Sequence, residues 1–112
     1  MSEESDERIA RTESLFRGVN ERIAETAARF GAEEASFVCE CARTDCTEHV
    51  RATLVEYEQV RADGTRFILA PGHELPDVER VTRRSKRFEL VEKVKPRVRK
   101  AAEKLDPRAQ ES

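Results

Sequence analysis

Tryptophan is absent from this sequence, and aromatic residues make up only 5% of its 112 positions. Charged residues, by contrast, reach 39%, well above the roughly 25% of an ordinary globular domain. Little material is left for a hydrophobic core, because it must come from five Phe, one Tyr and the Val, Ile and Leu positions. The length and composition therefore predict one small domain with appended helices or tails, and they exclude a large multi-site enzyme.

Long hydrophobic runs are also missing. No stretch of the chain approaches the ~18–20 consecutive apolar residues of a membrane span. The first seven residues, MSEESDE, are acidic and polar, which is the opposite of a secretory signal peptide. We therefore expect a cytoplasmic protein that does not enter a membrane.

The charges are unevenly distributed along the chain, although the net charge is only −2. Residues 78–112 hold twelve basic and six acidic side chains, whereas acids predominate before them. Five basic residues surround the tip of a predicted hairpin: Arg80, Arg83, Arg84, Lys86 and Arg87. This region is a candidate contact for nucleic acid or another anion, but Phe88 is the one aromatic residue in it, and single-strand binders usually offer several stacking rings. A solvated, charge-rich face is the simpler interpretation.

The N-terminal residues 3–30 are predicted to form one long amphipathic helix. Its apolar residues form a single stripe with a seven-residue repeat: Ile9, Phe16, Val19, Ile23, Ala27 and Phe30. Gly31 follows at the position of a C-terminal cap. Such a helix spans about 42 Å, longer than the small body that follows. We therefore expect part of it to project or to pack on a protein partner, most simply a second copy in a homodimer.

The rest of the chain alternates between strand and helix signals. Thr53-Leu54-Val55-Glu56 is a capping box, and Pro96 is well placed to open a last helix. The signals predict strands at 36–41, 50–52 and 66–70, a helix at 54–62, a hairpin at 78–94 and a helix from 96 to 105. The predicted fold class is α+β, with a long N-terminal helix, a small antiparallel sheet stapled by a metal site, and short helices.

The chain is accordingly divided into an N-terminal amphipathic helix (1–34), a compact metal-stapled α+β domain (35–95), and a C-terminal helix with a disordered tail (96–112). A compact body of about 60 residues buries only ~60% of its unfolded surface and is marginally stable alone. Scaffolds of this size commonly add a structural metal. The small core is therefore a reason to consider the three cysteines as metal ligands.

Three cysteines lie within eight residues, in the pattern Cys39-x-Cys41-x4-Cys46. In a reducing cytosol, a tight cluster of this kind is more often a metal site than a disulfide framework. Three sulfurs need a fourth ligand to complete a tetrahedron around one ion. His73 is the preferred fourth ligand, because a ligand from a distant segment closes a long loop; His49, three residues after Cys46, is the alternative.

The triplet resembles the zinc-binding cysteines of the post-SET segment that follows methyltransferase SET domains, where a fourth ligand comes from elsewhere. The resemblance covers eight residues and implies zinc binding, not methyltransferase activity. A longer pattern, FVCEC-x4-C continuing to TL-x-EYE-x-VRAD and APGHE, is similar to a family of small uncharacterised proteins of actinobacterial type. That resemblance covers residues 37 to about 93 and implies one compact bacterial unit without indicating an activity.

Several alternatives to a structural zinc site stay open from the sequence alone. The cysteines could be buried small apolar residues, or they could form a thiol redox sensor that loses its metal on oxidation. Three Cys and one His also hold the 2Fe–2S cluster of CDGSH-type proteins, although the third Cys follows more closely here. A small zinc enzyme would need an open metal position and a general base, for which Glu74 and Glu48 offer only weak support. We therefore expect an interaction or regulatory module rather than an enzyme.

Overall fold

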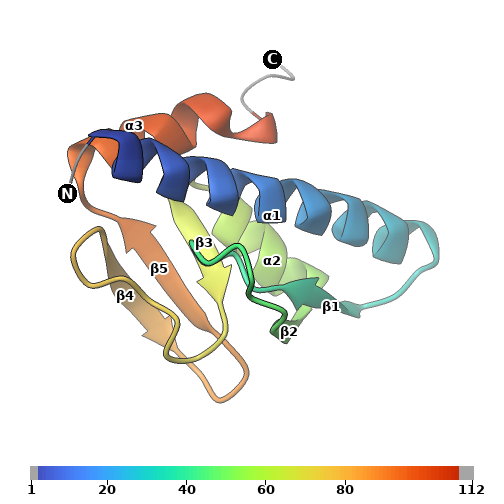
Figure 1. Ribbon diagram of the computed structural model, residues 1–112. Helices are drawn as coiled ribbons and strands as arrows, with labels where there is room; N and C mark the ends of the chain where they lie inside the picture. Colours follow the sequence, from blue (N-terminus) through green and yellow to red (C-terminus); the bar gives the residue numbers. More distant parts are fainter. Residues whose placement is uncertain (1–2, 109–112) are drawn as a thin grey trace.

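The computed structural model describes residues 3–108 and shows an α+β arrangement (Figure 1). A long helix and a C-terminal helix lie side by side above two small antiparallel sheets. The elements follow the chain in the order α1 (Glu3–Arg29), β1 (Glu34–Val38), β2 (His49–Thr53), α2 (Leu54–Arg61), β3 (Arg66–Leu69), β4 (Glu79–Arg84), β5 (Glu89–Lys93) and α3 (Pro96–Leu105). The predicted fold class is confirmed.

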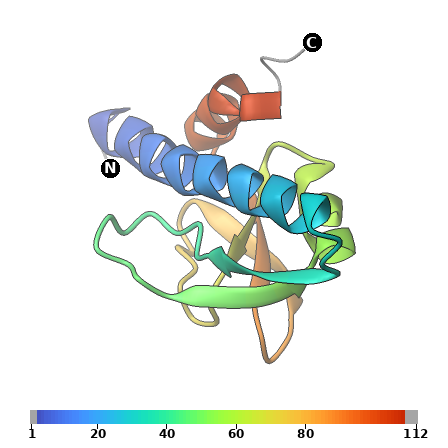
Figure 2. The same ribbon diagram turned by 90° about the vertical axis from the view of Figure 1, so that its right-hand side faces the viewer.

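The strands divide between two sheets rather than forming one. β1 pairs with β2, and a separate three-stranded sheet has the order β3-β5-β4. The two sheets are linked where the chain leaves β1, because the Glu40 N–H donates to the Ile68 carbonyl of β3 (2.9 Å). The view in Figure 2 shows α1 above the β1–β2 pair, with the second sheet behind it. The cysteine segment therefore bridges the two sheets.

Local signals account for several element boundaries. The Thr53 side chain accepts from the Glu56 N–H (3.0 Å), and the Glu56 carboxylate accepts from the Thr53 N–H (2.8 Å), so the predicted capping box opens α2. Gly31 ends α1 with a φ of 72°, a left-handed conformation that glycine adopts without strain. α3 begins at Pro96, as predicted, and the cysteines follow β1 instead of lying within it.

The hydrophobic core lies between α2 and the two sheets. Phe37 of β1 stacks on Tyr57 of α2, with ring centroids 4.5 Å apart. Phe67 and Ile68 of β3 and Val91 of β5 are fully buried in the same cluster, together with Cys39 and Cys41. Because two of the three cysteines belong to this core, the site they form is continuous with the packing of the domain.

The face of α1 that packs on the body is polar, which differs from the predicted apolar stripe. Glu13, Arg17 and Asn20 are buried, whereas Phe16 and Ile23 are half-buried and Val19 is exposed. Hydrophobic periodicity counts apolar residues only, so it does not detect a helix that is positioned by buried hydrogen bonds and ion pairs. The predicted stripe instead follows the border between the buried and the exposed face.

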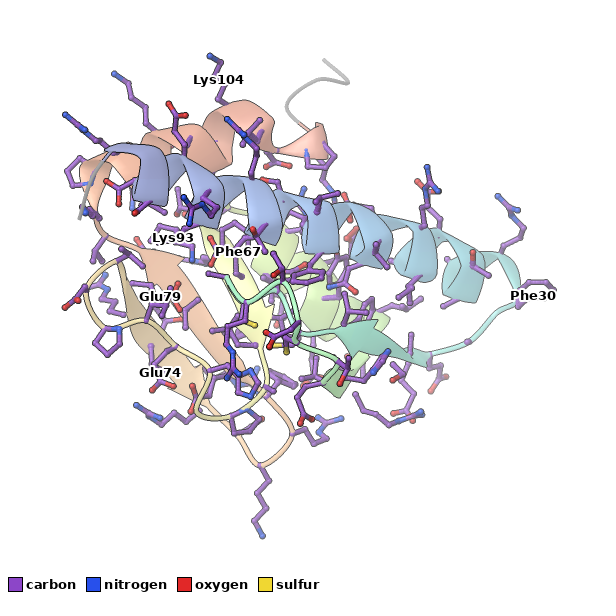
Figure 3. The ribbon with its side chains drawn as sticks, in the orientation of Figure 1. Phe30, Phe67, Glu74, Glu79, Lys93 and Lys104 are labelled. Carbon is purple, nitrogen blue, oxygen red and sulfur yellow. The ribbon has the colours of Figure 1, made fainter. Side chains whose placement is uncertain are left out.

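Arg17 and Lys93 illustrate how this polar face is held. The Arg17 guanidinium donates to the carbonyls of Gly64 (2.9 Å) and Arg66 and lies over the Phe67 ring, 3.6 Å from its centroid. Lys93, fully buried in β5, makes ion pairs with Glu13 of α1 and Glu79 of β4. Figure 3 shows Lys93 and Phe67 beneath α1. The helix is therefore fixed along its length on the body.

Two further predictions concern the C-terminal tail and the absence of a membrane-spanning segment. The disordered tail predicted after α3 falls partly on residues 109–112, which lie outside the described residues, but its described part is held: Arg108 pairs with Glu21 (2.6 Å) and Glu58 (2.5 Å). Among residues 3–108, no helix combines the length and the apolar character that a bilayer crossing requires.

Candidate metal centre

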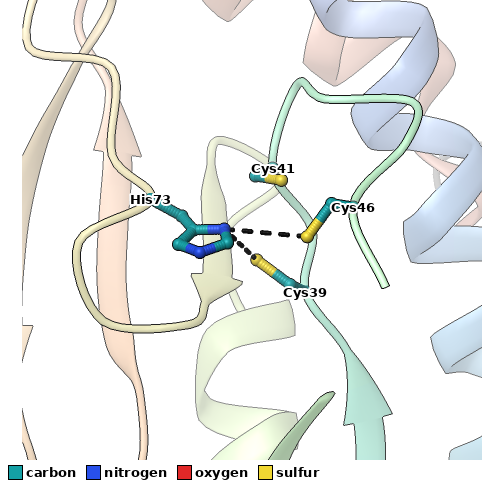
Figure 4. Close-up of side chains that lie close together, drawn as sticks. All are labelled: Cys39, Cys41, Cys46 and His73. Atoms are coloured by element: carbon teal, nitrogen blue, oxygen red, sulfur yellow. Dashed lines mark hydrogen bonds between the residues drawn. The ribbon is translucent and has the colours of Figure 1, made fainter. Parts of the chain in front are cut away.

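Four side chains from three segments meet beside the core (Figure 4). Cys39 and Cys41 follow β1, Cys46 lies in the loop before β2, and His73 lies in the turn after β3. Their ligand atoms all lie within 4.8 Å of one another. The His73 Nδ1 is 3.6 Å from the Cys39 Sγ and 3.6 Å from the Cys46 Sγ. The arrangement is one that could hold a metal ion.

These separations match the edges of a tetrahedron around a single small ion. With metal–sulfur bonds of about 2.3 Å and metal–nitrogen bonds of about 2.0–2.1 Å, tetrahedral angles place S and N about 3.6 Å apart. The two S···N distances at His73 have this value. A 2Fe–2S cluster divides its four ligands between two irons, which spreads them further apart than the ligands of one ion.

Backbone hydrogen bonds bring the cysteines together. The Cys39 N–H donates to the Glu48 carbonyl (3.0 Å) and thereby continues the β1–β2 pairing by one step. Beyond it the chain turns, and the Cys46 N–H donates to the Arg43 carbonyl (3.1 Å). The four residues between Cys41 and Cys46 therefore form a compact turn, which brings the Cys46 sulfur back to the sulfurs of Cys39 and Cys41.

His73 is positioned by a tight turn at the end of β3. Gly72 has a φ of 85°, and the His73 N–H donates to the Ala70 carbonyl (3.2 Å). A side chain at Gly72 would be strained in this left-handed conformation, so glycine permits the turn that aims the imidazole back at the sulfurs. The buried strand before the turn fixes its place relative to Cys39.

The surroundings of the buried sulfurs suit thiolates bound to a cation. Burial raises the pKa of the Cys39 and Cys41 thiols, because it removes the water that would hydrate their thiolates. The Ala70 N–H donates to the Cys39 Sγ (3.1 Å). In the same way, the backbone N–H of Arg43 lowers the pKa of Cys41. A metal ion at this site would supply positive charge beside these thiolates, and N–H donors of this kind orient and stabilise metal-bound sulfur.

Glu40 lies between the two buried cysteines and joins them to α1. Its carboxylate is fully buried and accepts from the Asn20 side-chain amide (2.9 Å) and from the Ile68 N–H (3.0 Å). Asn20 also donates to the Val38 carbonyl (2.9 Å) and accepts from its N–H (2.8 Å). Neither residue was predicted from the sequence to belong to the site. An acid placed between two buried cysteines was the available signal for Glu40, whereas Asn20 gave none.

The structure places the other candidate residues outside the cluster. His49 is exposed at the start of β2, and its Nδ1 lies 3.1 Å from the Thr47 carbonyl oxygen rather than beside the sulfurs. Glu74, the acid next to His73, pairs with Arg84 (3.3 Å). His73 is therefore the histidine that the fold brings to the three cysteines.

Most of the five candidate nucleic-acid contacts are engaged with acids of the same chain. Arg80 pairs with Glu92 (3.5 Å), Arg84 with Glu89 (2.7 Å), and Arg83 and Arg87 both with Glu56 (3.8 and 3.2 Å). Lys86 is exposed at the tip of the β4–β5 hairpin. The arginines on this surface are thus part of a salt-bridge network, which reduces the positive charge they present.

The chain was compared with protein-family models, curated proteins and solved structures, and none of them matches it. The function is therefore inferred from the geometry of the cluster and the chemistry of its four ligands.

Proposed function

We propose that this protein binds one structural zinc ion through Cys39, Cys41, Cys46 and His73. The observation that carries the proposal is the convergence of three thiol sulfurs and one imidazole nitrogen within 4.8 Å, from segments separated by up to 34 residues. Zinc takes Cys and His ligands in tetrahedral geometry, and a closed shell of four protein ligands is typical of a structural site. The residue set favours zinc over the harder cations, which prefer oxygen ligands.

In this role, the zinc ion ties together the two sheets of a domain with a small core. Cys39 and Cys41 follow β1 in the chain, Cys46 precedes β2, and His73 follows β3. Binding free energy at such a site acts largely as folding free energy, because the four ligands converge only in the folded chain. The zinc ion therefore supplies stability that a domain of this size lacks from burial alone.

The ligand set is best tested by cobalt substitution. Protein stripped of metal under reducing conditions is titrated with Co²⁺, and its visible absorption is recorded. Tetrahedral Cys3His coordination predicts intense d–d bands together with sulfur-to-cobalt charge-transfer bands, saturating at one ion per chain. His49→Ala should give the wild-type spectrum, whereas His73→Ala should alter the d–d bands. Weak, octahedral-type absorption in the wild-type protein would contradict the proposal.

We further propose that the zinc-stabilised domain acts as an interaction module that self-associates through the outer face of α1. Leu15 and Val19 on this helix and Phe30, which directly follows it, are 72%, 45% and 81% exposed. Figure 3 shows Phe30 at the end of α1, directed away from the body. Exposed apolar side chains gathered along one helix are typical of a binding surface.

Charged residues that border these apolar side chains favour a second copy as the occupant. An antiparallel pair of α1 helices centred on Gly18 would place Arg11 opposite Glu25 and Glu7 opposite Arg29. All four of these charged residues are exposed. A Cβ at Gly18 would meet no atom within 4 Å, so the helix surface is open there and two backbones can approach closely. Two complementary pairs, each occurring twice, would set the orientation of the dimer.

A further inference from the structure

The three cysteines differ in their access to solvent. Cys39 and Cys41 belong to the buried core, whereas Cys46 is half-buried. Cys46 lies in the loop between β1 and β2, where residues 43–45 and 47–49 are exposed. A small oxidant arriving from solvent therefore meets the Cys46 sulfur before either of the others.

The structure also distinguishes the two sulfurs that could react with an oxidised Cys46. The Cys41 and Cys46 sulfurs lie within 4.8 Å of each other, and the four residues between them form the compact turn described above. A disulfide between them would close a short loop in a surface segment, where little chain entropy remains to be lost. Cys41 is therefore the nearer partner in sequence, with four residues between it and Cys46.

Cys39 is held back from this reaction. Its sulfur accepts the Ala70 N–H (3.1 Å), which ties Cys39 to the residue that follows β3. Its segment is pinned on both sides, because the Cys39 N–H donates to Glu48 and the Glu40 N–H donates to Ile68. A Cys39–Cys41 disulfide would also strain the chain, since only one residue separates them.

We infer that Cys46 is a modification site for hydroperoxides and that its oxidation ends in a Cys41–Cys46 disulfide with release of the zinc ion. The inference rests on the proposed zinc site. It adds a regulated state to that site: the reduced chain holds zinc, and the oxidised chain does not. The substrate class is hydrogen peroxide or a small organic hydroperoxide.

The reaction with hydrogen peroxide balances in two steps. The Cys46 thiolate attacks one peroxide oxygen, the O–O bond breaks, the sulfur becomes a sulfenic acid, and hydroxide leaves. The Cys41 thiolate then attacks the Cys46 sulfur, the S–S bond forms, the S–O bond breaks, and a second hydroxide leaves. Two thiolates are thereby oxidised by two electrons, the peroxide is reduced, and two protons from solvent convert both hydroxides to water.

Loss of the metal follows from the ligand count. The disulfide removes two of the four ligands, so only Cys39 and His73 remain, and neither zinc geometry nor thiolate charge is preserved. Reduction of the disulfide by a dithiol restores both thiolates and the site. The ion would then bind again, which makes the change reversible.

The experiment uses the full chain, reduced and loaded with zinc, with the zinc content measured before oxidation. Hydrogen peroxide in molar excess is added, and released zinc is followed with a chromogenic chelator; a parallel sample receives peroxide pretreated with catalase. The oxidised protein is then digested with trypsin and with a protease that cleaves after glutamate. Cleavage at Glu40 separates Cys39 from Cys41, and cleavage at Arg43 separates both from Cys46.

The expected result is one zinc ion released for each disulfide formed, with residues 41–43 linked to residues 44–48, and recovery of zinc binding after treatment with dithiothreitol. A cross-link that carries residues 35–40 would overturn the inference, as would zinc loss without any disulfide. A protein that contains zinc and keeps it in peroxide contradicts this inference alone. A protein that contains no zinc at the start contradicts the proposed function.

Discussion

His73 is separated from the cysteines by the whole of β2, α2 and β3, yet its imidazole reaches two of the three sulfurs at 3.6 Å. The turn at Gly72 and the buried strand before it make this possible. His49, although close to Cys46 in sequence, is turned away because it begins β2 on the exposed side of the sheet. The two histidines therefore form a matched pair for mutagenesis.

His73→Ala should lower both zinc affinity and thermal stability, because an unfilled tetrahedral position weakens a site whose binding energy is on the order of 10 kcal/mol in structural zinc peptides. His49→Ala should change the free energy of unfolding by less than about 0.5 kcal/mol, as expected for an exposed side chain. Zinc retention after competition with a chelator, and melting temperature, are the measurements. Equal effects of the two substitutions would refute the assignment of His73.

The buried cluster of Glu13, Lys93 and Glu79 contains two carboxylates around one ammonium group. Burial raises the pKa of Glu13 to about 7, with the repulsion of Glu79 adding to the effect and the attraction of Lys93 opposing it. The second oxygen of Glu13 has no hydrogen-bond partner within the described part of the chain. Protonation of Glu13 therefore relieves an excess negative charge inside the protein.

This cluster predicts a pH dependence with a definite sign. The folded-state pKa of Glu13, about 7, lies above its ordinary value of 4.5. Between these two pH values, the folded protein therefore keeps a proton on Glu13 that the unfolded chain has already released. The stabilisation is complete below about pH 4.5 and is lost as the pH rises to about 7, by an amount on the order of 3 kcal/mol.

The control for this prediction is Glu13→Gln, which keeps the shape of the side chain but does not titrate. Both proteins are unfolded with urea between pH 5 and 8, with zinc present throughout so that protonation of the metal ligands affects both equally. The wild-type protein should lose stability relative to Glu13→Gln as the pH rises. A constant difference across this range would show that Glu13 does not change its protonation state there.

At the scale of elements, Asn20 joins α1 to the segment that carries the cysteines. Asn20 bonds to the backbone of Val38 and to the buried carboxylate of Glu40, which lies between Cys39 and Cys41. Removal of this amide leaves the Glu40 carboxyl buried with one donor fewer, and leaving a buried polar group without a hydrogen-bond partner is destabilising. Removal of the Asn20 amide should therefore affect both the packing of α1 and the loop that carries the cysteines.

Asn20→Ala is expected to reduce the free energy of unfolding by about 2–3 kcal/mol and to increase the rate of zinc loss to a chelator. Thr26→Ala, at an exposed position of the same helix, is the control and should change neither quantity appreciably. Chemical denaturation and chelator kinetics on the two variants make the comparison. Unchanged zinc-loss kinetics in Asn20→Ala would contradict the coupling between α1 and the site.

The proposed helix pairing also makes an element-scale prediction. Arg11→Glu should weaken self-association by placing like charges opposite Glu25, and the double variant Arg11→Glu with Glu25→Arg should restore it. Val19→Glu should abolish association, whereas Val55→Glu, at an exposed apolar position on α2, should not. Analytical ultracentrifugation of zinc-loaded protein gives the result. A wild-type chain that stays monomeric at high concentration would contradict the proposal.

For the whole molecule, sequence patterns identified nearly all of the elements. The capping box at Thr53, the breaker at Gly31 and the Pro at position 96 marked boundaries that the structure has, because each acts through local backbone chemistry. The division of the strands between two sheets was not predictable, since it depends on which strands pair across long stretches of the chain. The packing face of α1 was missed for the same reason, because Arg17 and Asn20 bind distant backbone groups.

The candidate site was predictable to the extent that its chemistry is local. Three cysteines in eight residues indicate a metal on spacing alone, and the thin core gave a physical reason to expect one. The choice between two histidines depended on tertiary structure, and the sequence favoured His73 only by a loop-closure argument. The same thin core makes the central claim testable, because a domain stapled by zinc must lose much of its stability with the ion.

The most direct test of this account is elemental analysis of protein purified without added metal, combined with thermal melts in the presence and absence of a strong chelator. We predict close to one zinc ion per chain and a large fall in melting temperature when the ion is removed under reducing conditions. A metal-free protein whose melting temperature is unaffected by the chelator would contradict the account.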